Sequence, residues 1–293
     1  ASPRMDGKQA ELVCRFKDPS GRVLLGQPVE VGSDEPAEAV LLREQGPNAL
    51  YGDLALSSER APVTTLLAPL DPVAIICIGL NYAQHAAESG MKAPEYPVVF
   101  HKAVSTLQHP NGPIELPSIE PKVDWEVELA VVIGKRCKDV SESEALGYVA
   151  GYTAANDVSG RFWQLERGGG QWCFGKSFDT FTPLGPVLAT TKAVPNPQAL
   201  RVRTLIDGKV MQDSNTSDMI FSVARIIAFL SQGTTLLPGT VILTGTPQGV
   251  GLGLKPQRWL APGETVTVEI EKVGKLTNPV RRADSQKRKS EFQ

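Results

Sequence analysis

The chain has 293 residues, of which 30 are Lys or Arg and 32 are Asp or Glu, and its formal net charge is −2. A charge so close to zero provides no broad positive field for holding nucleic acid or an anionic membrane. No apolar run approaches the roughly 20 residues needed to span a bilayer, and the widely spaced cysteines form no CxxC pair, so we expect an intracellular protein with reduced thiols, in the cytoplasm or the mitochondrial matrix.

The sequence predicts a small N-terminal domain at residues 1–70. Residues 11–17 alternate loosely like a strand, and residues 22–26 follow a Pro-Ser-Gly turn. A Pro-punctuated connection occupies residues 64–72, and the composition changes after it. We therefore place a boundary near residue 70, with a larger domain at 71–280 and a polar tail at 281–293.

The larger domain begins with a strand and a short helix. Residues 73–79 are continuously apolar, which suits a strand buried on both faces. Asn81 is a candidate N-cap and Gly90 a candidate stop for the helix that follows. On that helix His85 and Glu88 are three residues apart and therefore share a face.

A second strand is predicted at residues 97–102, and an acidic one at residues 123–134. In the acidic strand, apolar residues alternate with Asp124, Glu126 and Glu128. A period of two gives one apolar and one acidic face, and residues two apart lie about 6.5 Å from each other. Glu126 and Glu128 can therefore point at one site, where close anions repel unless water or a cation lies between them. A solvated outer face is the alternative for a bare Glu-x-Glu.

The rest of the chain continues in short elements. Ser141 to Glu144 has the pattern of a capping box that opens a helix, and residues 148–157 form a strand ending on Asp157. Residues 200–211 form a hairpin that turns at Asp207-Gly208. The longest helix is expected from Ser217 to Gln232, and a last strand at 264–271. Many turns, with 27 Gly and 23 Pro, indicate a strand-rich fold.

Residues 170–177 match the phosphate-loop pattern GxxxxGK[ST], but their context argues against nucleotide binding. The motif acts between a buried strand and a helix whose first amides hold phosphate. Here the preceding residues are a glycine run, and Pro183 and Pro186 prevent a long helix from following.

Five segments of the chain resemble the fumarylacetoacetate hydrolase family, and they follow one another in the family's order: residues 78–85, 124–134, 156–164, 175–186 and 243–251. The resemblance extends from about residue 73 to 280 and is strongest to the subgroup of fumarylacetoacetate hydrolase domain-containing protein two. It implies a β-rich α+β fold, a mixed β-roll preceded by a small N-terminal domain, in a chain that is usually a homodimer.

The resemblance also implies the residues of a site. Three carboxylates would hold Mg²⁺, with Mn²⁺ or Ca²⁺ as possible substitutes: Glu126, Glu128 and Asp157. Hard oxygen donors without Cys or His agree with such a metal. The catalytic residues would be His85 and Glu88, an acid–base pair on a mobile lid helix, together with Lys176. The substrate would contact Arg161, Gln164 and Thr246.

Two positions depart from the family pattern, which usually has Ala at Gly160 and Asp at Phe162. We expect Gly160 to loosen the turn after Asp157. Phe162 removes a charge beside Arg161 and leaves open how that arginine is held.

The resemblance implies metal-dependent keto–enol chemistry on a small anionic 2-oxo dicarboxylic acid. Because the subgroup is associated with oxaloacetate enol–keto tautomerisation, a tautomerase is the leading expectation. An acylpyruvate C–C hydrolase or an oxaloacetate decarboxylase would use the same ligands. A metal-stabilised binding protein without turnover is the non-enzymatic alternative. No nucleic acid or membrane partner is expected.

Overall fold

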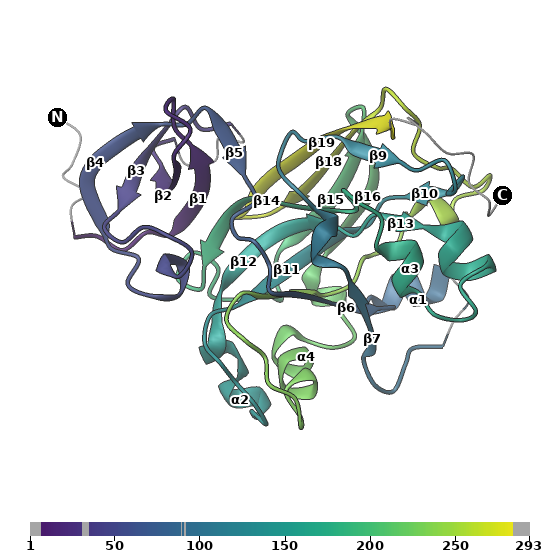
Figure 1. The fold of residues 1–293 in the computed structure, drawn as a ribbon. Coiled ribbons are helices and arrows are strands. Elements are labelled where there is room, and N and C mark those ends of the chain that lie inside the picture. The colour runs from purple at the N-terminus through teal and green to yellow at the C-terminus, as the bar shows by residue number, and fades with distance from the viewer. Residues whose placement is uncertain (1–6, 31–34, 89, 91, 284–293) are drawn as a thin grey trace.

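The computed structural model describes residues 7–30, 35–88, 90 and 92–283. Its elements form two units side by side, a smaller one containing β1 to β5 and a larger one containing the other strands (Figure 1). Strands dominate both units and the helices are short, which confirms the β-rich α+β class. No helix in the described residues is long and apolar enough to cross a membrane.

The N-terminal unit is a curled antiparallel sheet in which β1 pairs with both β2 and β5. Its strands are β1 (Leu12–Lys17), β2 (Val23–Pro28), β3 (Glu38–Leu42), β4 (Leu56–Pro62) and β5 (Thr65–Leu67), with a 3-10 turn at Ala49–Tyr51. β1 also pairs with β14 of the larger unit, with Leu12 opposite Ala189, so one sheet continues across both units. The expected boundary near residue 70 falls between β5 and β6.

The larger unit is built on a mixed sheet with the strand order β14-β12-β11-β17-β6-β7. These strands are β6 (Ala74–Gly79), β7 (Val98–Lys102), β11 (Val127–Ile133), β12 (Val149–Asn156), β14 (Thr182–Thr190) and β17 (Thr240–Leu243). Every residue of β11, β14 and β17 is buried, which explains their largely apolar sequences. β17 and β6 run parallel, with Leu243 opposite Cys77, so the segments that follow both strands meet at one edge.

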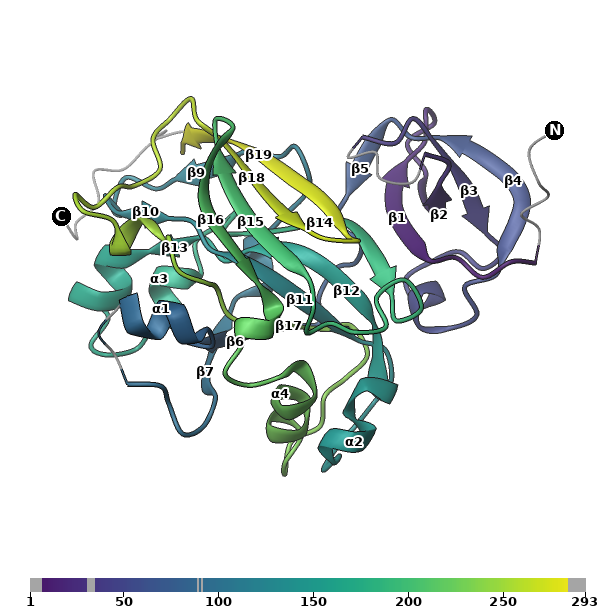
Figure 2. The same ribbon diagram turned by 180° about the vertical axis from the view of Figure 1, so that it is seen from behind.

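A second sheet packs over the first, and Figure 2 shows it from behind. Its order is β16-β15-β18-β19-β9, with β9 (Ile114–Leu116), β15 (Arg201–Ile206), β16 (Lys209–Asn215), β18 (Thr265–Ile270) and β19 (Gly274–Arg282). The β15–β16 hairpin turns at Asp207 and Gly208, whose φ values of 48° and 79° suit the predicted tight turn. Val127 and Leu129 of β11 share one core cluster with Val202 and Val268 of this sheet.

Short elements connect the strands. The α-helices are α1 (Ala83–Glu88), α2 (Glu142–Ala145), α3 (Cys173–Lys176) and α4 (Val223–Leu230), and a π-helical turn spans Phe162–Glu166. Small strands are β8 (Leu107–Gln108), β10 (Val123–Asp124) and β13 (Ser159–Gly160), and 3-10 turns lie at Val104–Thr106, Leu146–Tyr148, Thr216–Asp218 and Gly251–Gly253. The capping box at Ser141 and Glu144 is present at the start of α2, as predicted.

The predicted helix from Ser217 to Gln232 is wrong in its first turns, because α4 begins only at Val223. Ser222 caps it through its side-chain oxygen. Before the cap, the N–H of Ile220 donates to the carbonyl of Asn81, 2.8 Å away. This tertiary bond keeps the preceding segment out of the helix, although its apolar periodicity favours one.

Asn81 is not the N-cap that the sequence predicts, but a buried bridge between three segments. Its Nδ2 donates to the carbonyls of Phe221 and Thr244 at 3.1 and 2.7 Å, and its Oδ1 accepts from the N–H of Phe221 at 2.8 Å. Asn81 is fully buried. It therefore fixes the entrance to α1 against the end of β17 and the approach to α4.

Asn81→Ala should lower the free energy of unfolding by about 2–5 kcal/mol, because it leaves the partners of three hydrogen bonds without a replacement. Urea unfolding measures this difference. Asn48→Ala is the control, since Asn48 is exposed and its side chain makes no cap bond; we expect a change within about 0.5 kcal/mol. Equal stability of the two variants would contradict the bridge.

Candidate metal and acid–base site

The acidic face of residues 123–128 is buried. Asp124, Glu126 and Glu128 are 0%, 5% and 2% exposed, and Trp125 and Val127 on the other face are 0% exposed. Regular pairing is interrupted within this stretch, because β10 ends at Asp124 and β11 starts at Val127. The single strand predicted at residues 123–134 is therefore two shorter strands. Because the three acidic side chains are buried, the alternative of a solvated sheet face is wrong.

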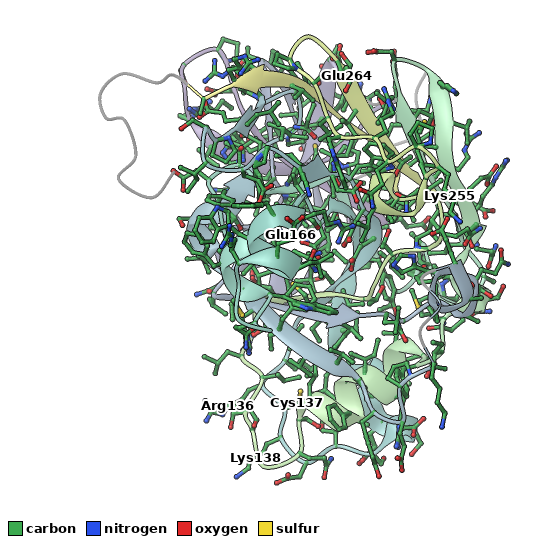
Figure 3. The ribbon with its side chains drawn as sticks, turned by 90° about the vertical axis from the view of Figure 1, so that its right-hand side faces the viewer. Arg136, Cys137, Lys138, Glu166, Lys255 and Glu264 are labelled. Carbon is green, nitrogen blue, oxygen red and sulfur yellow. The ribbon has the colours of Figure 1, made fainter. Side chains whose placement is uncertain are left out.

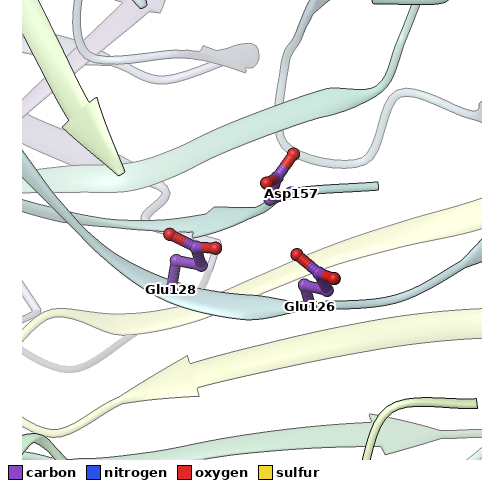
Figure 4. Close-up of side chains that lie close together, drawn as sticks. All are labelled: Glu126, Glu128 and Asp157. Atoms are coloured by element: carbon purple, nitrogen blue, oxygen red, sulfur yellow. The ribbon is translucent and has the colours of Figure 1, made fainter. Parts of the chain in front are cut away.

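Asp157 joins the two glutamates because β11 and β12 are antiparallel neighbours. Val127 pairs with Asn156, so Asp157, one residue beyond β12, lies beside Glu126, and its N–H donates to the Glu126 carbonyl at 2.9 Å. Oxygens of Glu126, Glu128 and Asp157 all lie within 4.8 Å of one another, and Figure 4 shows the carboxylates gathered around one space. This carboxylate group could hold a metal ion.

Three buried cations surround the carboxylates. The Nζ of Lys176 lies 2.7 Å from both Glu126 Oε2 and Asp157 Oδ2. The Nζ of Lys102 lies 2.6 Å from Asp157 Oδ1, and Arg161 Nη2 lies 2.6 Å from Glu126 Oε1. Since burial removes the hydration of every one of these charges, each depends on its partners.

The cations separate the pKa values of the two glutamates. Burial raises the pKa of Glu126, but Lys176 and Arg161 outweigh burial and lower that pKa to about 2. Burial, together with the charges of Asp157 and Glu126, raises the pKa of Glu128 well above its usual value. Burial lowers the pKa of Lys176, but the neighbouring carboxylates raise it overall. Lys176 therefore stays protonated and donates hydrogen bonds in this arrangement.

The donor set fits a divalent cation. The three carboxylates offer only hard oxygen ligands, which suit Mg²⁺, Mn²⁺ or Ca²⁺. The Lys176 ammonium already lies between Glu126 and Asp157, which shows that the space among them accepts positive charge. Glu128 accepts a hydrogen bond from the N–H of Gly245 at 2.6 Å, and no ion pair involving Glu128 is present among the described residues. A cation would relieve the repulsion that raises its pKa.

Lys102 is a member of the site that sequence reasoning missed. β7 buries Phe100 and Lys102 and exposes the residue between them, so both side chains share the inward face. Besides Asp157, the Nζ of Lys102 donates to the carbonyls of Val158 and Phe181 at 3.1 and 2.7 Å. The available signal was a lysine at an inward position of a predicted strand.

The residues expected to contact substrate lie around one cavity. Arg161 donates to Gln164 Oε1 at 2.8 Å, in the π-helical turn that ends at Glu166, labelled near the centre of Figure 3. Thr246 accepts from Gln212, another residue that the sequence did not single out, at 2.9 Å. The cavity measures about 70 Å³, and its polar side is lined by His85, Glu126, Glu128, Arg161, Gln164, Lys176 and Thr246. Seven predicted residues thus meet there; Glu88 and Asp157 do not line the cavity.

Asp124 explains how Arg161 is held without an acid at Phe162. The Nε of Arg161 donates to Asp124 Oδ2 at 2.8 Å. Asp124 is held in turn by the N–H groups of Gly251 and Leu252, at 2.7 and 3.0 Å. The departure from the family pattern at Phe162 therefore leaves Arg161 with a buried carboxylate partner.

Gly160 does not loosen its turn, as the sequence suggested, but makes room for Glu120. A Cβ atom at Gly160 would lie 2.5 Å from Glu120 Oε2. Glu120 is 3% exposed and accepts the N–H groups of Phe162 and Trp163 at 3.3 and 3.1 Å. Glu120 therefore fixes the start of the turn that carries Gln164.

His85 and Glu88, the expected acid–base pair, lie on α1 beside a glycine-containing loop. His85 Nδ1 is 3.4 Å from Glu88 Oε2, and the N–H of Gly249 is 3.3 Å from the Glu88 carboxylate. A Cβ atom at Gly253 would lie 2.6 Å from Glu88 Cδ, so a side chain at position 253 would displace the carboxylate from its present place. The contact places His85 at the cavity; movement of α1 as a lid stays a prediction.

Comparison with known proteins gives consistent matches. Residues 74–281 match the family model described as fumarylacetoacetate (FAA) hydrolase C-terminal. A protein of Burkholderia orbicola (strain MC0-3), provisionally named a hydrolase, is 54% identical over 209 residues, which are 71% of this chain and 74% of that protein. The mitochondrial oxaloacetate tautomerase fahd2 of Xenopus laevis is 46% identical over 217 residues, which are 74% of this chain and 68% of that protein.

A solved structure has the same fold. The crystal structure of 5-carboxymethyl-2-hydroxymuconate delta-isomerase from Mycobacterium smegmatis matches with a TM-score of 0.79 at 37% identity. The match covers 93% of this chain and 100% of that one. The β-rich architecture of this chain is therefore that of a solved isomerase.

Lys102→Met should lower the free energy of unfolding by about 3–5 kcal/mol, because it removes one partner of a fully buried ion pair. Thermal or urea unfolding measures the loss. Lys138→Met removes an exposed charge and should change stability by no more than about 0.5 kcal/mol. If both variants unfold like the wild type, the pairing of Lys102 with Asp157 is refuted.

Metal binding should release a proton, because a metal ion needs the ionised form of Glu128 and the pKa of that group is raised. Below the raised pKa the apparent Mg²⁺ affinity should rise with pH, by up to about tenfold per unit, and above it the affinity should level off. Calorimetry in buffers of different ionisation enthalpy measures the released proton.

Glu128→Gln removes the titrating group. It should weaken Mg²⁺ binding and flatten its pH dependence, whereas the exposed Glu142→Gln should alter neither. A Glu128→Gln variant that keeps the wild-type affinity and pH slope would count against the carboxylate group as the metal site.

Proposed function

The chain belongs to the fumarylacetoacetate (FAA) hydrolase C-terminal family, and from that premise we propose that it catalyses Mg²⁺-dependent keto–enol chemistry on a small 2-oxo dicarboxylic acid. Its matched relatives are named as a tautomerase, an isomerase and a hydrolase, so the chain is an enzyme, and the non-enzymatic alternative is not retained. The leading candidate reaction is oxaloacetate enol–keto tautomerisation. The observation that carries it is the convergence of the carboxylate group and His85 on one small cavity.

The charges of the site favour an anionic substrate. Glu126, Glu128 and Asp157 would hold Mg²⁺, which when bound polarises a carbonyl oxygen and stabilises negative charge that develops there. With Asp124, the four buried carboxylates exceed the three buried cations by one charge, and a divalent ion reverses that sign. The resulting net positive charge favours an anionic substrate such as a 2-oxo acid.

Tautomerisation needs one proton moved between C3 of the substrate and the enol oxygen. His85 lines the cavity, and an imidazole is the side chain that most often serves as a general acid or base, so we assign the proton transfer to it, with Glu88 orienting its ring. Arg161 and Gln164 orient the substrate. Lys176, protonated between two carboxylates, supplies positive charge.

The size of the cavity also favours a small substrate. About 70 Å³ is far below the roughly 300–1,000 Å³ of sites that bind drug-sized ligands. A four-carbon acid needs less rearrangement to enter than a long acyl chain. A homodimer remains a proposal that rests on the family alone, and light scattering on the purified protein measures it.

Acylpyruvate C–C hydrolysis is the second candidate. A relative at 54% identity is provisionally named a hydrolase, and the His85–Glu88 pair has the composition needed to activate a water molecule. Decarboxylation of oxaloacetate would use the same ligands and is an outcome of the experiment below.

The test is a substrate panel of enol-oxaloacetate, keto-oxaloacetate and acetylpyruvate, each with Mg²⁺ or with EDTA. We expect rapid loss of the enol form, without release of CO₂ or pyruvate, that EDTA abolishes. Cleavage of acetylpyruvate would select the hydrolase, and CO₂ release the decarboxylase. Equal rates with EDTA would overturn the metal-dependent reaction.

His85→Gln should reduce kcat by about 10²–10⁴-fold, the usual contribution of a general acid–base group, while calorimetry finds Mg²⁺ affinity unchanged. His101→Gln is the matched control, because His101 is exposed on β7 and points away from the site. A His85→Gln enzyme with the wild-type kcat would remove this histidine from the mechanism.

A further inference from the structure

Part of the cavity wall is apolar, and the proposed chemistry does not use it. This apolar part consists of Ile78, Leu80, Phe100, Leu165, Trp172 and Leu252. Proton transfer and metal binding need polar groups, so an apolar wall has a different task. It contacts whatever part of the substrate extends away from the charged groups.

The Trp172 ring packs directly against the backbone of Gly79, where a side chain would clash with it. A Cβ at Gly79 would lie 2.3 Å from Cζ3 and 2.9 Å from Cη2 of the indole. Gly79 is not among the glycines with positive φ, so its backbone conformation is open to other residues. The Trp172 ring therefore occupies the space that a side chain at Gly79 would fill.

The indole also contacts Phe100, which links it to the charged part of the site. Phe100 meets it edge-on, with ring centroids 5.5 Å apart and planes at 65°. The same Phe100 ring lies 5.0 Å from the Nζ of Lys176. The backbone N–H of Lys176 donates to the Trp172 carbonyl at 3.3 Å. The wall and the catalytic lysine are thus parts of one packed unit.

We propose that Trp172, seated on Gly79, is the end wall of the substrate cavity and the residue that limits substrate length. The inference rests on the proposed function and adds to it that the enzyme selects short 2-oxo acids against those with a long apolar tail. Trp172 lines the cavity and is half-buried, so part of its side chain also faces solvent. Leu165 lines the same cavity and is 49% exposed, so it provides an apolar surface along which a longer chain could lie once the indole is removed.

The experiment measures dissociation constants, by calorimetry with Mg²⁺ present, for straight-chain 2,4-dioxo acids from 2,4-dioxopentanoate to 2,4-dioxononanoate, together with turnover of enol-oxaloacetate. In the wild type, affinity should fall as the chain lengthens, by roughly 10-fold or more for the added methylenes that meet the wall. In Trp172→Ala, the ratio of the dissociation constant for the longest acid to that for the shortest should be at least about 10-fold lower than in the wild type.

Gly79→Ala tests the seat of the indole. Its methyl group should displace the ring and weaken binding of the shortest acid, and Gly79→Ala/Trp172→Ala should return to the affinity of Trp172→Ala alone. Phe174→Ala is the control, because this aromatic side chain lies two residues after Trp172, is 53% exposed and does not line the cavity. Its length profile should be that of the wild type.

Three results would overturn the inference. The first is a Trp172→Ala variant whose affinity falls with chain length as it does in the wild type. If the alanine variant does not fold, Trp172→Leu, which keeps an apolar side chain, answers the same question. The second is a Gly79→Ala/Trp172→Ala variant that binds the shortest acid no more tightly than Gly79→Ala does. A wild type that neither binds nor turns over any of these acids would instead refute the proposed function, and the length selection with it.

Discussion

Seven ionisable side chains are buried close together, and the pairing of their charges constrains the rest of the larger unit. Removing a carboxylate or an ammonium from water costs several kcal/mol even after relaxation, so a buried charge needs partners, and Glu128, which forms no ion pair among the described residues, has a raised pKa instead. The partners come from β7, from the residue after β12, from Arg161 just before the π-helical turn at residues 162–166, and from α3 at residues 173–176. Each segment is far from the others in sequence, and each is held where its charge is needed.

The site divides into a rigid part and a part held by few contacts. The carboxylates lie on or beside the buried central strands β11 and β12, whose backbone bonds fix their positions. His85 and Glu88 lie on a six-residue helix, and their contacts are long: 3.4 Å between the two side chains, and 3.3 Å between the Glu88 carboxylate and the N–H of Gly249. Such a division suits an enzyme in which metal ligands must not move while an acid–base group adapts to substrate.

Sequence periodicity predicted the parts of this arrangement that depend on local geometry. Alternation put Glu126 and Glu128 on one face of a strand, and the Asp-Gly pair at residues 207–208 marked its hairpin. The inclusion of Asp157 came from the family resemblance, because strand register is not visible in a single sequence. Lys102 was missed for the same reason, since its partner Asp157 lies 55 residues away.

Two further outcomes have a tertiary cause. A solvated acidic face had to stay open as an alternative, because a sequence does not show that Lys102, Lys176 and Arg161 cover that face. The first turns of the predicted last helix had the right period, but the bond from Ile220 to Asn81 outweighs helix propensity there. Local preference decided the outcome only where no distant contact competed with it.

The fit between Gly160 and Glu120 has a consequence for substitution. A Cβ atom at Gly160 would lie 2.5 Å from Glu120 Oε2 and 2.8 Å from its Cγ, so a methyl group there requires the glutamate side chain to move from the amides whose hydrogen bonds it accepts. The two positions are therefore energetically coupled: the cost of alanine at 160 depends on which side chain stands at 120.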